Sequence, residues 1–196
     1  MVVPSGIHRD IYLPFLRRLK SLYAIMDQQY RELADSYGFV CRGCEDNCCL
    51  TRFYHHTFLE YYYLFEGYCS LATDKRSAFT ERARKVCRQM EAANQNEEVM
   101  KAMCPLNEAG LCFLYAHRPM ICRLHGIPHE FQKPGQRVVS GAGCEAFTHQ
   151  CQEYGYIPFD RTPFYMEMAG LEKELKRVLG TTQKIKMTIA EMITTF

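Results

Sequence analysis

Residues 41–49 read CRGCEDNCC, and residues 104–126 read CPLNEAGLCFLYAHRPMICRLHG. These two stretches hold seven of the eleven cysteines of the chain. Such tight spacing is typical of metal or redox sites in a protein that keeps its thiols reduced. Gly43 and Asn47 allow the backbone of the first stretch to turn tightly, so that several sulfurs can point to one place. We therefore expect the fold to be organised around these stretches.

The rest of the composition describes a globular, cytoplasmic protein. The chain has 196 residues, 47% of them hydrophobic, and a net charge of +2. The charge therefore gives no indication of a nucleic-acid partner. No apolar run reaches the roughly 18 residues of a membrane span, and Met1–Arg9 lacks the pattern of a signal peptide. An odd cysteine count, with Cys48 and Cys49 adjacent, also argues against a framework of disulfides.

Helical periodicity dominates both ends of the chain. Residues 10–37 predict a long amphipathic helix that stops at Gly38. Thr57 and Glu60 form a capping-box pattern before an aromatic-rich helix to about residue 72, and a third helix should run from there to about residue 93. A further helix is expected from Pro163 to Leu179. Another capping box, Thr188 with Glu191, predicts a short last helix.

The segment 104–151 has a different composition, with five cysteines, four of the eight prolines and frequent turn signals. It predicts short strands and loops. The predicted fold class is therefore mainly α: one domain over 1–196, with helical flanks at 1–40 and 160–196. Between the flanks, residues 41–151 should form a small, irregular, cysteine-rich metal-binding core with short strands.

The candidate metal ligands are the eight cysteines of the motif stretches and their continuation. Thiolates are soft ligands that suit zinc, copper(I) and iron–sulfur clusters. Eight sulfurs are enough for two mononuclear sites, or for one cluster with spare thiols. The candidates are Cys41, Cys44, Cys48, Cys49, Cys104, Cys112, Cys122 and Cys144.

The two stretches resemble the CxxCxxCC family of zinc- or iron-chelating proteins, over roughly residues 41–125. The second stretch carries the more specific match: Cys104-Pro105-Leu106, Gly110, Cys112, Tyr115, Arg118-Pro119 and Cys122-Arg123. The resemblance implies a metal-binding cysteine cluster in a bacterial cytosolic protein. The first stretch departs from the family by one residue, because its spacing is C-x2-C-x3-CC. This insertion leaves open which of Cys48 and Cys49 takes the ligand role.

Spacing alone leaves the cofactor as an iron–sulfur cluster or zinc. Short cysteine intervals with a remote Cys-Pro favour iron–sulfur, whereas structural zinc usually uses two separated C-x2-C pairs or one such pair with histidines. The predicted function is metal binding with a structural, redox or sensory role. The alternative is a metal-dependent enzyme acting on a protein or small molecule, since the flagellin lysine N-methylases have a similar cluster. The sequence contains no G-x-S-x-G, P-loop or G-x-G-x-x-G motif.

Other residues have more ordinary interpretations. Cys69 and Cys87 are expected in the hydrophobic core, and Cys151 is left undecided. His125 is the best histidine candidate for a ligand, and His55 and His56 should point in opposite directions. Arg118 and Arg123 flank Cys122; each is expected either to offset the negative charge of thiolates or to form an ordinary salt bridge.

Overall fold

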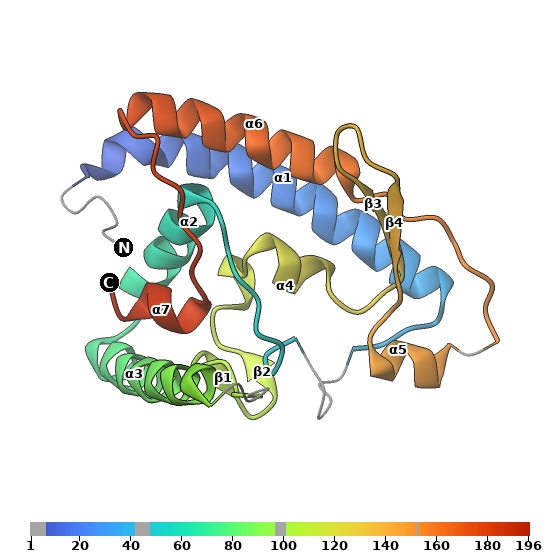
Figure 1. Ribbon diagram of the computed structural model, residues 1–196, viewed down its shortest axis with the longest axis horizontal. Coiled ribbons are helices and arrows are strands. Elements are labelled where there is room, and N and C mark those ends of the chain that lie inside the picture. The colour runs from blue at the N-terminus through green and yellow to red at the C-terminus, as the bar shows by residue number, and fades with distance from the viewer. Residues whose placement is uncertain (1–6, 42–47, 97–100, 152) are drawn as a thin grey trace.

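The computed structural model describes residues 7–41, 48–96, 101–151 and 153–196 (Figure 1). Two long helices, α1 (Arg9–Ser36) and α6 (Thr162–Val178), pack side by side along one edge of the molecule. Beneath them lies α2 (Phe58–Cys69), which contacts both. The long α3 (Thr73–Gln95) packs against the short C-terminal α7 (Ile189–Ile193) on the opposite side. The prediction of a mainly helical protein is confirmed.

The helices differ in how much of their surface is buried. The inward face of α1 includes Leu19, Leu22 and Met26, as its 3.6-residue periodicity predicted. In contrast, α2 is buried almost all round, and even the consecutive Tyr61, Tyr62 and Tyr63 are each less than 9% exposed. This helix is therefore the centre of the core, with the other helices arranged around it.

The helix boundaries follow the predicted signals closely. Thr57 accepts a hydrogen bond from the Glu60 N–H at the start of α2, and Thr188 and Glu191 form a complete capping box at α7. Gly38 and Gly180 lie just beyond α1 and α6 with φ of 64° and 63°, the left-handed conformation that glycine adopts without steric cost.

The middle of the chain is irregular but contains more helix than expected. Two antiparallel hairpins are present, β1 (Asn107–Glu108) with β2 (Leu111–Cys112) and β3 (His129–Gln132) with β4 (Val138–Gly141). The 3-10 turn η1 (Tyr115–His117) and the short helices α4 (Met120–Leu124) and α5 (Glu145–Gln150) accompany them. We expected only strands and loops here, because five or six residues are too few for helical periodicity to show.

One sequence prediction about the core was wrong. Cys69 is exposed, because it is the last residue of α2 and lies where that helix leaves the core. Cys87 packs against the core while staying partly accessible, and Cys151 is buried with its Sγ 3.5 Å from the Tyr37 carbonyl oxygen.

Candidate metal centre

The candidate cysteines come from four separate segments of the chain. Cys41 follows α1, and Cys48 and Cys49 precede the extended segment 51–55. Cys104 precedes β1, Cys112 is the last residue of β2, Cys122 lies on α4, and Cys144 is the residue before α5. Cys44 falls outside the described residues.

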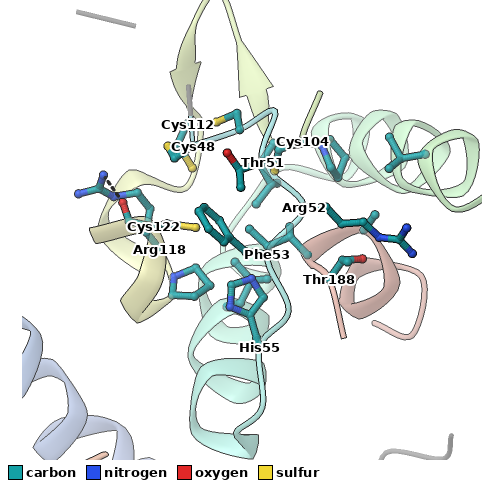
Figure 2. A pocket seen from close by; sticks show the side chains of 18 of the residues that line it. Cys48, Thr51, Arg52, Phe53, His55, Cys104, Cys112, Arg118, Cys122 and Thr188 are labelled. Atoms are coloured by element: carbon teal, nitrogen blue, oxygen red, sulfur yellow. Dashed lines mark hydrogen bonds between the residues drawn. The ribbon is translucent and has the colours of Figure 1, made fainter. Parts of the chain in front are cut away.

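Seven described cysteines line two adjoining cavities. A cavity of about 70 Å³ is bordered by Cys48, Cys49, Cys104, Cys112 and Cys122 (Figure 2). A larger one of about 490 Å³ shares four of these and adds Cys41 and Cys144. The fold therefore places both motif stretches around one region, although no three Cys, His, Asp or Glu groups of the described segments converge closely enough to form a metal-ion site by themselves.

Backbone hydrogen bonds hold the two motif stretches together. The Cys104 N–H donates to the Cys49 carbonyl oxygen at 2.7 Å. Beyond this point the chain turns back through Ala109 and Gly110, which have φ of 51° and 85°. Asn107 stabilises the turn by accepting the Gly110 N–H at 3.1 Å through its side-chain oxygen. This tight hairpin returns Cys112 to the same cavity that Cys104 borders.

The thiols at this junction affect one another's ionisation. Hydrogen bonding with the thiols of Cys104 and Cys48 lowers the pKa of Cys49, and the same bonds raise the pKa values of those two partners. Burial raises the pKa of Cys122 and that of Cys112. The arrangement therefore favours one thiolate among protonated thiols, and a cation is needed before several of them ionise together.

Arg118 supplies a positive charge beside the cysteines. Its guanidinium stacks over the Tyr115 ring at 3.6 Å and donates to the carbonyl oxygens of Tyr115 and Cys122 at 3.1 and 3.2 Å. It borders both cavities, and within the described part of the chain no carboxylate forms an ion pair with it. This position fits the expected offset of thiolate charge, and among the described residues no salt bridge accompanies it.

Arg123 has the ordinary role instead. Its side chain is 4% exposed and pairs with Asp27 of α1 at 2.5 Å. It also donates to the carbonyl oxygens of Arg118 and Ala116 and lies over the Tyr23 ring at 4.2 Å. Arg123 therefore fixes the loop 115–118 against α1 and acts on the site through the loop that carries Arg118.

A second junction positions Cys144. The Cys144 N–H donates to the Gly126 carbonyl oxygen at 2.9 Å, and the Tyr30 hydroxyl donates to the neighbouring His125 carbonyl oxygen at 2.8 Å. Burial, together with the nearby thiols of Cys41 and Cys144, raises the pKa of Tyr30. Tyr30 thus links α1, the 125–126 turn and two candidate ligands.

The histidines contribute less to the walls of the two cavities than the cysteines do. His125 borders the larger cavity, where its ring packs against Phe53 with 5.4 Å between ring centres. His55 is buried 3.8 Å from the Glu60 carboxylate while His56 is exposed, so the two point in opposite directions as predicted. His117 and His129 pack against Tyr63 and Gly141, away from the cysteines.

The surroundings of the smaller cavity are mainly apolar. Figure 2 shows Phe53 beside Cys122, with His55 farther from the cysteines, and Leu64, Met90 and Leu106 complete much of the wall. Phe53 and Asn107 were not identified from the sequence, because isolated Phe and Asn residues carry no metal-site signal. Only the Asn107–Gly110 turn pattern was recognisable.

Comparisons with models of protein families, with curated proteins and with solved structures found no match. None of the helices in the described part of the chain is long and apolar enough to cross a membrane.

Proposed function

We propose that this protein binds an iron–sulfur cluster or zinc through its cysteine cluster, and that it belongs with the CxxCxxCC proteins its motifs resemble. One observation carries the proposal. Seven cysteines from segments spread over residues 41–144 border two adjoining cavities. Independent hydrophobic packing would not gather so many thiols in one region and leave the exposed Cys69 outside it.

The thiol donors of the site fit an iron–sulfur cluster or zinc. Thiolates are the preferred ligands of zinc and of iron–sulfur clusters, and the Arg118 guanidinium, which borders both cavities, would offset part of their negative charge. A bound metal would lower the pKa values of the thiols that burial now raises. The bound cluster or zinc ion would supply structural cross-linking, electron transfer or sensing.

The apolar wall favours an iron–sulfur cluster over zinc as the first test. Leu64, Leu106 and Leu114 are each buried and border the cysteine cavity. An apolar, enclosed surrounding excludes solvent and sets the reduction potential of such clusters. Zinc remains the alternative, with four of the thiols forming a closed tetrahedral site.

The first experiment is anaerobic purification followed by an absorption spectrum and analysis for iron, zinc and acid-labile sulfide. Iron with sulfide and a broad band near roughly 400 nm would identify an iron–sulfur centre. Zinc without colour would identify a structural zinc site. Protein that is folded and free of all three after expression in metal-replete medium would contradict the proposal.

Single serine substitutions test the ligand set. We expect Cys49→Ser, Cys104→Ser and Cys122→Ser each to lower the metal content, because each removes a soft ligand that borders the cavity. Cys69→Ser is the matched control, since Cys69 is exposed and borders neither cysteine cavity. Equal metal content in all four variants would show that these cysteines are not the ligands.

The larger cavity favours a second candidate function, a metal-dependent enzyme acting on a protein or small molecule. Its volume of about 490 Å³ lies within the range of small-molecule sites. It brings Tyr30, Asp27 and Arg118 next to the cysteines. Titration of the metal-loaded protein with candidate ligands, monitored by the spectrum of the centre, would test this alternative.

A further inference from the structure

A separate cavity of about 360 Å³ lies between the β3–β4 hairpin and the segment 154–156. None of the described cysteines borders it. Its wall contains four aromatic side chains and one carboxylate, contributed by four different parts of the chain: Tyr37, Phe147, Tyr154, Tyr156 and Glu130.

The aromatic side chains are held in defined positions. The Tyr37 hydroxyl accepts the Ile157 N–H at 2.6 Å, so that its ring cannot reorient freely. The rings of Phe147 and Tyr154 stand at 89° and 83° to the Tyr37 ring, with centres 4.8 and 6.2 Å away. The Tyr156 hydroxyl accepts the Phe159 N–H at 3.3 Å. Together with Tyr156 these three residues line the cavity, and we call this set of four aromatic side chains the aromatic box.

Two of these tyrosines are more exposed than their size predicts. Tyr154 is 55% exposed and Tyr156 is 47% exposed, although both border a cavity whose inner wall is the buried Tyr37 and Phe147. Large aromatic side chains normally bury most of their surface against neighbours. Here their rings are left accessible to a ligand that enters the cavity.

Glu130 places a negative charge in the same wall. It lies on β3 opposite Ser140, and its carboxylate is close enough to the Tyr156 hydroxyl to interact with it. Among the segments that the structure describes, no Lys, Arg or His forms an ion pair with Glu130. The carboxylate is therefore available to pair with a ligand of positive charge.

We propose that this cavity binds an organic cation with an alkylated ammonium group. Aromatic faces attract such cations electrostatically, and their methyl groups pack on the rings better than a strongly hydrated ammonium does. The Glu130 carboxylate adds a charge partner at the same site. The ligand is either a free quaternary ammonium compound or a methylated lysine of a partner protein, since both present the same group.

The proposal is tested by titrating the purified, full-length protein with tetramethylammonium and choline chlorides while recording aromatic NMR signals. We expect saturable shifts of the Tyr154 and Tyr156 signals. The control ligand is 3,3-dimethylbutan-1-ol, which has the shape of choline without its charge and should bind at least about tenfold more weakly. A trimethyl-lysine peptide and its unmethylated form distinguish the protein-borne source from the free one.

Variants test the wall directly. Glu130→Gln keeps the shape but removes the charge, and Tyr154→Leu removes one aromatic ring; each should weaken choline binding by about two- to fivefold. Glu167→Gln, an exposed carboxylate on α6, is the matched control and should bind as the wild type does. Melting curves show whether each variant is folded. The proposal is overturned by an absence of saturable shifts, by equal binding of the neutral alcohol, or by unchanged binding in folded Glu130→Gln and Tyr154→Leu.

Discussion

At the scale of single residues, chain position rather than residue type decides the role of each cysteine. Cys122 faces the cavity from α4, Cys151 is buried beside Tyr37, and Cys69 is exposed at the end of α2. The same holds for the two arginines beside Cys122. Arg123 forms a buried ion pair with Asp27, while Arg118 borders both cysteine cavities and pairs with no carboxylate of the described residues. Sequence spacing could not separate these roles, because each depends on what the rest of the chain brings nearby.

Gly126 is the residue whose replacement should disturb the site most simply. Its φ is 120°, and a Cβ built there would lie 2.7 Å from the Tyr30 hydroxyl oxygen. We expect Gly126→Ala to lower the free energy of unfolding by about 3 kcal/mol, because backbone strain and a steric clash act together. Urea unfolding followed by circular dichroism would measure the loss.

Gly135 is the matched control for this substitution. Its φ is 71°, but a Cβ there would meet no atom within 4 Å. Gly135→Ala should therefore cost only about 1 kcal/mol from the left-handed backbone. Equal losses for the two variants would mean that the close approach of Tyr30 to the 125–126 turn does not contribute.

At the scale of elements, the buried helix α2 depends on a carboxylate from another helix. Glu172 of α6 accepts the N–H groups of Phe58 and Leu59 at 3.0 and 3.2 Å. These are two of the N–H groups that the first turn of any helix leaves without intrahelical partners. Burial raises the pKa of Glu172, while the two backbone hydrogen bonds act in the opposite direction. Helix α2 can thus enter the core without unsatisfied donors.

Two glutamates on α6 make a direct test of this contact. Glu172→Ala should cost about 3 kcal/mol of unfolding free energy, because it leaves two buried N–H groups without acceptors. Glu174→Ala removes an ion pair with Arg18 in which both side chains are more than 40% exposed, and should cost less than about 1 kcal/mol. Chemical denaturation of both variants would measure the difference. A similar loss in the two would show that water replaces Glu172 at the start of α2.

At the scale of the whole molecule, the cysteine region joins parts of the chain that are far apart in sequence. Backbone contacts already link Cys49 to Cys104 and Gly126 to Cys144. A metal bound by thiols from these segments would cross-link them in the folded state and stabilise it against unfolding.

Removal of the metal should therefore lower the melting temperature. A cross-link between Cys49 and Cys104 closes a long chain loop and should add about 4 kcal/mol to the free energy of unfolding. Its loss should lower the melting temperature by about 10 °C for a domain of this size. Differential scanning calorimetry of the metal-loaded protein, before and after treatment with a chelator under reducing conditions, would measure it. Cys69→Ser should show the same fall as the wild type. An unchanged melting temperature after complete metal loss would mean that the centre has no structural role.

The sequence by itself determined the mainly helical fold, the approximate bounds of its long helices and the capping residues at Thr57 and Thr188. These features depend on local periodicity and on hydrogen bonds between near neighbours, so a single chain segment contains the whole signal. The eight candidate cysteines were also evident from the sequence, because their spacing is local within each motif.

Only the tertiary structure decided which segments meet. It placed Cys104 beside Cys49, gave Tyr30 a role at the 125–126 turn, left Cys69 outside the core and formed the aromatic box around Glu130. The short helices α4 and α5 likewise appear only in the folded protein. Each of these features depends on contacts between residues distant in sequence, and such contacts form only when the helices pack into a common core.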